Sequence, residues 1–413
     1  MSPPGSGPLA GLRVVDCSTV LAGPYCTMLL ADLGADVIKV EPPEGDATRG
    51  WGPPWVGAND EATRTAAYFL AVNRSKRSIR LDLHKTDGAA VLTKLLEGAD
   101  VLVENFRPGG LERLGFGEAA LEEINPRLVH LAISGYGPVG PDAGRPGYDF
   151  VLQAEAGLMS ITGYSDEDLG RPTKVGVAIT DVVTGLHGAV SVLAAVAGRE
   201  RVGGAGHDAG QRIDVSLLAS TLAILVNQAQ NAFVNGVSPG RAGNAHPNIV
   251  PYETFATADG EIAVAVGSER QWPRFCSALG LAELAVDPRF TTNGKRVDGR
   301  VALSSILAGR FLTKSTADWV ARFAAADVPA SGINDILTAL GTPQARLLEM
   351  TVDVDHPGYG RTRQVGPPFS LSRTPTTTPT APPLLGEHTD EILTAHGFTS
   401  TEIASLKTSG AVA

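Results

Sequence analysis

The sequence predicts an α/β protein whose main sheet is mostly parallel. Over the first 200 residues, short runs rich in Val, Ile and Leu alternate with amphipathic runs of helical period, as expected of strands joined by crossover helices. The strand-like runs are short and rich in Val, Ile or Leu, which is typical of strands buried on both faces. With 413 residues and 43% hydrophobic content, the chain can bury a large core without metal or disulfide staples.

The expected elements follow one another in regular order. Strands are expected at 12–16, 36–40, 78–83, 101–104 and 128–134, with helices at 25–33, 88–96 and 117–124 between them. These helices end at Gly34, at Gly98 and near Pro126, residues that commonly end helices. Because ligands bind beyond the carboxyl ends of parallel strands, the loops that follow the strands form the candidate site.

The rest of the chain changes in composition. Two longer apolar helices are expected at 181–196 and 216–233, on either side of the glycine-rich turn VGGAGHDAG, whose role stays open. A smaller second domain is expected over 237–334, with a strand at 261–266 and helices at 271–279 and 316–325. The Pro- and Thr-rich stretch 372–384 predicts an extended surface segment. A final helical pair is expected at 388–396 and 401–406.

Charge and composition disfavour several classes of protein. A formal net charge of −10 disfavours nucleic acid and anionic membrane surfaces as partners. The N-terminus lacks the features of a signal peptide, and the longest apolar runs, 188–198 and 215–226, are shorter than a bilayer requires. The three cysteines include no CxxC pair, which indicates reduced thiols. We therefore expect a soluble, cytoplasmic protein.

The common cofactor and metal motifs are interrupted or absent. The GxGxxG string GYGPVG, at 135–140, carries prolines where a nucleotide-binding helix has to begin. GxxxxGK[ST] and HExxH do not occur, and the GxSxG match around Ser238 has Pro after the serine. No Cys/His set has metal-binding spacing. The motifs thus favour neither a nucleotide cofactor nor a metal.

Asp181 is the residue with the clearest chemical interest. It follows the strand-like run 175–180 and begins a long apolar helix, so its carboxylate is expected at a helix N-terminus. Such a residue is either a helix N-cap or an ionised nucleophile that attacks an activated acyl group such as a thioester. A basic cluster is either a solvated surface stripe or a site for an anionic ligand; it comprises Arg74, Lys76, Arg77, Arg107 and Arg113.

A series of segments resembles the class III CoA-transferases of the CaiB/BaiF type, a family that includes formyl-CoA transferase and α-methylacyl-CoA racemases. In order they are PLAGLRVVDCSTVLAGP, LGADVIKVEPPEGD, NRSKRSIRLDL, VENFRPGGLERLG, NPRLVHLAISGYG, GYDFVLQAEAG, GQRIDVSLL, GNAHPNIVPYETF, DGEIAVAVG and PLLGEHTDEIL. The resemblance implies a large Rossmann-like domain from both chain ends, placed at 1–225 and 336–413. It also implies a small α+β domain at 226–335 and an interlocked homodimer.

The resemblance implies that Asp181 is the catalytic nucleophile. Its carboxylate attacks an acyl-CoA donor to form a mixed anhydride, the released CoA converts this to an aspartyl-CoA thioester, and a carboxylic acid acceptor takes the CoA. Acyl activation is conserved throughout, so the resemblance implies no metal, redox cofactor or ATP. Coenzyme A is then a substrate, and the partners are the acyl-CoA donor and the acceptor acid.

The resemblance places CoA against the loop after the first strand and the ENFRPGGLER loop. The implied contacts are Val20, Leu21, Ala22, Asn105, Phe106, Gly110 and Arg113. From their chemistry, Arg74, Lys76 and Arg113 supply cations for the CoA phosphates, and Phe106 packs on the adenine. Arg145 and Tyr148 complete the predicted binding site.

Two alternatives remain from the residues. Racemases of the family carry His where this chain has Tyr148, a poor acid/base group with a pKa ordinarily near 10, but Glu269 lies near an acidic position that racemases use. A non-catalytic acyl-CoA-binding protein is disfavoured, since binding alone needs no carboxylate at Asp181. The segment GNAHPNIVPYETF resembles relatives that act on dicarboxylic acids such as succinate or glutarate. The acceptor's carboxylate is left to one of four residues, Arg145, Arg171, Lys174 or His246.

Overall fold

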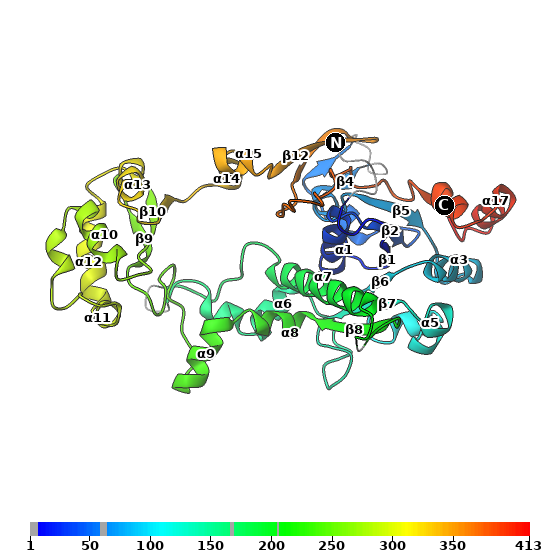
Figure 1. Cartoon of the computed structure of the whole chain (residues 1–413), viewed down its shortest axis with the longest axis horizontal. Helices are drawn as coiled ribbons and strands as arrows, with labels where there is room; N and C mark the ends of the chain where they lie inside the picture. Colours follow the sequence, from blue (N-terminus) through cyan, green and yellow to red (C-terminus); the bar gives the residue numbers. More distant parts are fainter. Residues whose placement is uncertain (1–6, 58–63, 166–168, 205) are drawn as a thin grey trace. The chain divides into compact units, whose positions relative to one another are not determined.

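The computed structural model describes residues 7–57, 64–165, 169–204 and 206–413 (Figure 1). The chain separates into two compact units. The first contains Met1–Leu158, Val175–Val226 and Pro343–Ala413, and the second contains Met159–Lys174 and Asn227–Thr342. Each is described by itself.

The first unit is built on a six-stranded sheet in the order β5-β2-β1-β6-β7-β8. All five neighbouring pairs are parallel, which confirms the predicted α/β fold. The strands are β1 (Arg13–Asp16), β2 (Asp36–Glu41), β5 (Lys76–Arg80), β6 (Val101–Glu104), β7 (Val129–Ser134) and β8 (Gln211–Ser216). The chain order reverses between β1 and β6, so the carboxyl ends of these two strands border a topological switch point, where α/β proteins bind ligands.

Helices cover both faces of this sheet (Figure 1). One core joins the sheet to α1 (Ala22–Asp32) and α7 (Ile179–Glu200), and the other joins it to α3 (Thr86–Glu97), α5 (Glu118–Ile124), α16 (Thr389–Ala395) and α17 (Ser400–Thr408). Neighbouring strand residues serve opposite cores: Val14 lies in the first and Val15 in the second. The smaller elements are η1 (Ala47–Gly50), β3 (Trp55–Val56), β4 (Thr65–Ala66), α2 (Ala67–Ala71), α4 (Gly110–Arg113), α6 (Asp149–Glu155), α8 (Leu217–Ala223), α15 (Pro343–Leu347), β12 (Thr351–His356) and β13 (Gly360–Val365).

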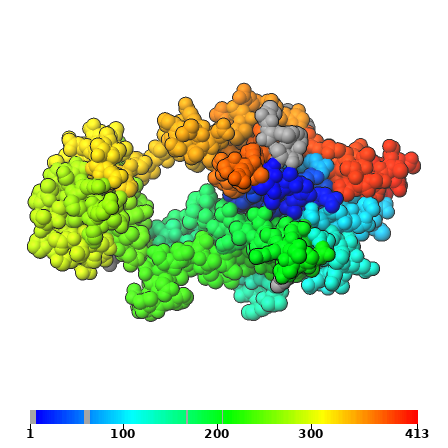
Figure 2. All heavy atoms as spheres, viewed as in Figure 1, coloured from blue at the N-terminus to red at the C-terminus, as the bar shows by residue number. Residues whose placement is uncertain are grey.

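The second unit surrounds an aromatic core. An antiparallel sheet of β9 (Tyr252–Ala256), β10 (Glu261–Ala265) and β11 (Ala330–Gly332) packs with α10 (Gln271–Leu279), α12 (Arg300–Phe311) and α13 (Thr316–Ala325). The bounds predicted for α10 and α13 are confirmed. Trp272, Phe275, Trp319 and Phe323 are fully buried among them; Figure 2 shows the outer surface of this part in yellow-green and yellow. Its other elements are η3 (Ala282–Ala285), α11 (Asn293–Asp298) and α14 (Ile336–Leu340); η2 (Leu158–Ile161) and α9 (Val226–Asn235) begin in the first unit.

Three sequence-based expectations are corrected. Strand β5 begins at Lys76, two residues before the predicted start, because Lys76 and Arg77 extend the strand while their charges are satisfied by ion pairs. Strand β8 was not predicted, because it is an edge strand with exposed polar residues rather than an apolar run. The predicted helix 216–233 is two helices, α8 and α9.

Helix α7 is longer than predicted. Its 22 residues are apolar enough to pass a length and composition test for a membrane span, contrary to the expectation that every apolar run is too short. Here α7 packs on α1 and on the sheet, with Ala189 and Val192 in the core. It is therefore a core helix of the α/β unit.

Gly185 permits the close approach of α7 to α1. A Cβ added there would lie 2.6 Å from the backbone oxygen of Ala22 and 3.1 Å from the ring of Tyr25, so one helix would have to shift. Ala22 is the first residue of α1, directly after the loop that follows β1, and Asp181 lies one turn before Gly185, so this contact sets the spacing between that loop and Asp181.

We expect Gly185→Ala to lower the free energy of unfolding by about 1–3 kcal/mol through overpacking. Misplacement of Asp181 should lower any activity of the site by about 10- to 100-fold. Chemical denaturation and steady-state assays measure the two effects. Gly198→Ala in the same helix is the control, because nothing lies within 4 Å of its added Cβ; equal effects of the two variants would contradict the prediction.

Candidate active site

A cavity of about 240 Å³ lies beyond the carboxyl ends of β1, β6 and β7. It is therefore at the switch point of the sheet. The loops after β1 and β6 and the β7–α6 connection form its walls. The structure thus brings eight predicted site residues together: Val20, Leu21, Ala22, Asn105, Phe106, Arg145, Tyr148 and Asp181.

Asp181 is placed differently from the expectation. Residues 175–178 form no strand, and Asp181 is the third residue of α7 rather than its N-cap, which is Ala178. Within the described part of the chain its carboxylate receives no hydrogen bond. The interpretation of Asp181 as an N-cap is therefore wrong, and its side chain lines the cavity.

Asp149, the first residue of α6, supplies the missing cap. Its carboxylate accepts the backbone N–H of Thr180 at 2.9 Å and the side-chain amide of Gln153 at 2.8 Å. Gln153 in turn accepts the backbone N–H of Val175 at 2.9 Å. A residue from another helix therefore binds the N-terminus of α7, which leaves Asp181 free of a structural hydrogen bond.

The electrostatic setting of Asp181 is unusual for a carboxylate. Burial raises its pKa to about 7, and the negative charge of Asp149 adds to the effect. Burial likewise raises the pKa of Tyr68 to about 12, with Asp181 and Asp149 as further causes. The dipole of α7 opposes these effects, since a helix N-terminus favours an anion. A carboxylate that titrates near neutrality in a cavity is a candidate catalytic group.

Two of the predicted phosphate-binding cations are buried instead. Arg74 is 3% exposed and forms a two-pronged ion pair with Asp32, at 2.9 and 2.6 Å. Lys76 is 2% exposed and binds Asp16 at 3.0 Å. The prediction that they bind CoA phosphates is corrected, because neither ammonium nor guanidinium reaches the cavity. The sequence shows that they are basic but not that carboxylates from other elements neutralise them.

The remaining cations lie around the cavity. Arg145 lines it, but its charge is shared with Glu155 at 2.6 Å and Asp142 at 3.2 Å. Arg113 is exposed on α4. Arg107 was part of the basic cluster but not of the predicted site; it is exposed, lines the cavity and forms no ion pair among the described residues.

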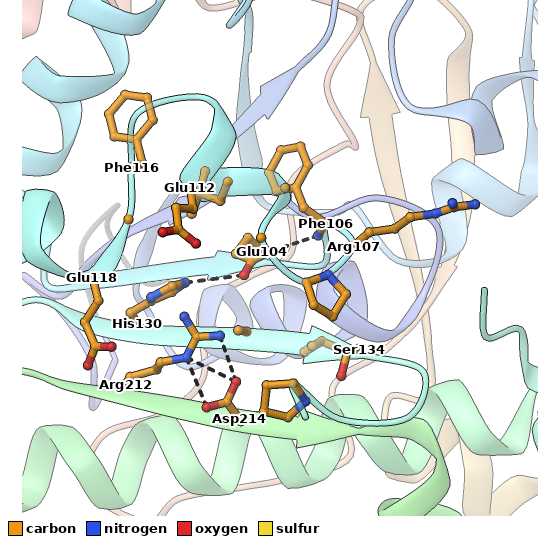
Figure 3. Close-up of a pocket in the computed structure, with 18 residues that line it drawn as sticks. Glu104, Phe106, Arg107, Glu112, Phe116, Glu118, His130, Ser134, Arg212 and Asp214 are labelled. Atoms are coloured by element: carbon orange, nitrogen blue, oxygen red, sulfur yellow. Dashed lines mark hydrogen bonds and ion pairs between the residues drawn. The ribbon is translucent and has the colours of Figure 1, made fainter. Parts of the chain in front are cut away.

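An adjoining cavity of about 260 Å³ includes Gly110 and the other side of the loop after β6 (Figure 3). Glu104 lines this cavity. One of its carboxylate oxygens accepts the backbone N–H of Phe106 at 2.7 Å, and the other lies 3.4 Å from Nε2 of His130. Arg107 extends away from this pair (Figure 3). Glu104 therefore fixes the start of the loop that carries Phe106 and Arg107.

The other candidates belong to the second unit. The carboxylate of Glu269 accepts the backbone N–H of Asn293 at 2.6 Å and pairs with Arg296 at 3.1 Å. The Nδ1 atom of His246 accepts the backbone N–H of Asn248 at 3.0 Å. Arg171 and Lys174 also lie in this unit, so Arg145 is the only one of the four acceptor candidates that lines the described cavity.

Fold and cavity together define an α/β protein with a carboxylate of raised pKa in a cavity at a topological switch point. The model of CoA-transferase family III matches residues 9–389. The chain belongs to this family and is a CoA-transferase. The resemblance drawn from its segments is thereby confirmed.

Its relatives include several named transferases. It is 41% identical to the succinate–glutarate CoA-transferase of Agrobacterium fabrum, over 94% of this chain and 95% of that one. It is 39% identical to the human succinyl-CoA:glutarate CoA-transferase, over 94% and 85%, and 37% identical to the succinyl-CoA:mesaconate CoA-transferase of Haloarcula hispanica, over 95% and 97%. A crystal structure of a CaiB/BaiF family protein from Brucella suis matches with a TM-score of 0.82 and 40% identity, over 95% and 100%.

Proposed function

We propose that this enzyme transfers CoA from succinyl-CoA to a dicarboxylic acid through covalent intermediates on Asp181. The observation that carries the mechanism is the placement of Asp181: it lines the switch-point cavity while Asp149 caps its helix. The substrate class is supported by the relatives named for succinate, glutarate and mesaconate.

The proposed reaction is a series of exchanges at the Asp181 carboxyl group. A carboxylate oxygen attacks the thioester carbon of the donor, the carbon–sulfur bond breaks, and the CoA thiolate leaves a mixed anhydride. The thiolate then attacks the carboxyl carbon of Asp181, which gives an aspartyl-CoA thioester and the free donor acid. The acceptor carboxylate attacks this thioester, the carbon–sulfur bond breaks, and a second mixed anhydride and the CoA thiolate form. The thiolate finally attacks the acceptor's carbonyl carbon, which gives the acceptor's CoA thioester and releases the carboxylate of Asp181. Each step conserves charge.

The CoA site is proposed on the loops after β1 and β6. Val20, Leu21 and Ala22 supply one wall and Phe106 a ring face for the adenine. Arg107 and Arg113 are the exposed cations for the phosphates, since Arg74 and Lys76 are buried.

We further propose that the enzyme is a cytoplasmic, interlocked homodimer, with domains at 1–225 plus 336–413 and at 226–335. Apolar side chains exposed within single helices support an interface. On α7, Leu186 and Val190 are 41% and 65% exposed, and on α9, Phe233 and Val234 are 79% and 73% exposed. Sedimentation equilibrium tests the oligomeric state.

Intact-protein mass spectrometry tests the covalent mechanism. Wild type and Asp181→Ala are incubated with succinyl-CoA, treated with hydroxylamine or borohydride, and mapped by peptide. An acyl or CoA adduct on Asp181 that the variant lacks is the expected result. No adduct from several acyl-CoAs, together with exchange of the α-proton of a 2-methylacyl-CoA in deuterated solvent, would replace the transferase mechanism with racemisation.

A further inference from the structure

The loop after β1 is held almost entirely by side chains from outside the loop. Five successive backbone groups, from Ser18 N to Val20 N, each bond a side chain. Asp16 accepts the N–H of Ser18 at 3.0 Å, and Lys39 donates to the carbonyl of Ser18 at 2.9 Å. The amide of Asn105 bonds both the N–H and the carbonyl of Thr19, at 2.9 and 2.7 Å. Asp46 accepts the N–H of Val20 at 3.4 Å.

Four of the side chains around this loop form a buried charge cluster: Asp16, Lys39, Asp46 and Lys76. Each is at most 2% exposed. Lys39 pairs with Asp46 at 2.9 Å, and Lys76 pairs with Asp16 at 3.0 Å. Burial by itself would raise the pKa of Asp16, but the two ammonium groups and its hydroxyl hydrogen bonds lower it to about 2. With two carboxylates and two ammonium groups, the cluster is balanced in charge when all four groups are ionised.

The loop is also strained where it meets the cavity. Val20 has φ of 71°, a left-handed conformation that costs a β-branched residue free energy and persists only where surrounding contacts impose it. Val20 lines the cavity together with Leu21 and Ala22. Asn105 donates to the carbonyl of the Thr19–Val20 peptide and Asp46 accepts its N–H, so two side chains hold the peptide unit that precedes Val20.

We infer that Lys39 and Asp46 are positioning residues for CoA: with Asp16 and Asn105 they fix the loop after β1 in its binding conformation before the ligand arrives. The inference rests on the proposed CoA site. A pair of opposite buried charges is seldom favourable for stability when compared with apolar residues of similar shape. Here the pair has a further role, because Lys39 and Asp46 each also form a hydrogen bond with one backbone group of the loop.

The test removes both charges of the pair together, so that neither is left buried alone. The variant is Lys39→Met with Asp46→Leu, in the full chain, which also removes both bonds to the loop backbone. Its control is Arg199→Met with Asp100→Asn, another ion pair with a 4% exposed cation, at 3.0 Å. That pair joins the C-terminal part of α7 to the start of β6, so it contacts no group of the loop.

Isothermal titration with free CoA measures the effect, alongside Tm and the KM of each substrate. We expect the loop variant to bind CoA at least about tenfold more weakly than wild type, because the loop is no longer held in its binding conformation. The KM of the acceptor acid should change by less than about threefold. The control variant should have a lower Tm than wild type, yet its CoA affinity should stay within about twofold of the wild-type value. If the loop variant does not fold, Lys39→Met with Asp46→Asn, which leaves neither charge buried alone and keeps an oxygen acceptor for Val20, is compared in the same way.

Two outcomes would overturn the inference: a folded loop variant that binds CoA as wild type does, or a control variant that is weakened equally. Wild type that binds no CoA and transfers none would instead overturn the proposed function on which the inference rests. The two failures are thus distinguishable.

Discussion

Replacement of Asp181 with Ala is expected to lower kcat by about ten-thousandfold, the order of loss seen when a covalent nucleophile is removed. Asp181 is the only carboxylate among the described residues that line the cavity, and Asp149, whose charge influences it, is bound to the backbone of Thr180 and to Gln153. Steady-state assays with succinyl-CoA and glutarate measure the loss.

Asp181→Asn is the matched control for structure. It keeps the shape of the side chain and removes the charge, so that CoA affinity by titration should stay within about threefold of wild type while turnover disappears. Residual turnover above about 1% in a freshly purified variant would contradict covalent catalysis by Asp181, because positioning alone would then suffice.

Much of the fold could be predicted because buried strands and amphipathic helices have recognisable local patterns of apolar residues. The core strands at Val101–Glu104 and Val129–Ser134 are rich in Val, Leu and Ile, and α10 is an amphipathic run that ends at Gly280. Strand β8 escaped because an exposed edge strand lacks that pattern. An element could thus be predicted where burial requires apolar residues, and could not be predicted where an exposed strand leaves the residue types free.

The site was predicted less completely because its chemistry depends on pairs far apart in sequence. The buried state of Arg74 is set by Asp32, 42 residues away, and that of Lys76 by Asp16, 60 residues away. The role of Asp149 as the cap of α7 could not be predicted, since its bond to Thr180 spans 31 residues. The one signal for Asp149 in the sequence is its position at the start of a helix just after Tyr148.

The rate of the first acyl transfer should depend on pH through Asp181. Only the ionised carboxylate is a nucleophile, and its pKa is raised to about 7 by burial and by Asp149. The value of kcat/KM for the acyl-CoA should therefore rise with pH, level off above about 7, and fall about tenfold for each unit below it. If the rate instead fell only near pH 4, the pKa of Asp181 would not be raised in the working enzyme.

Asp149→Asn separates the two roles of that residue. Asparagine keeps an oxygen that can accept the N–H of Thr180 but carries no charge, so the cap survives while the like-charge repulsion is removed. The acid limb should move down by about one pH unit and no further, because burial is the larger cause of the raised pKa. At pH 5.5 the variant should thus retain a larger share of its own plateau rate than wild type does.

The control for this shift is Asp142→Asn. Asp142 lies in the same β7–α6 connection and pairs with Arg145, but its charge is not a cause of the raised pKa of Asp181. Its loss can alter the KM for CoA through Arg145 without moving the limb. If both variants move the limb equally, the shift reflects the general charge of the cavity. If only Asp149→Asn moves it, the residue that frees Asp181 from capping also holds its pKa near neutrality.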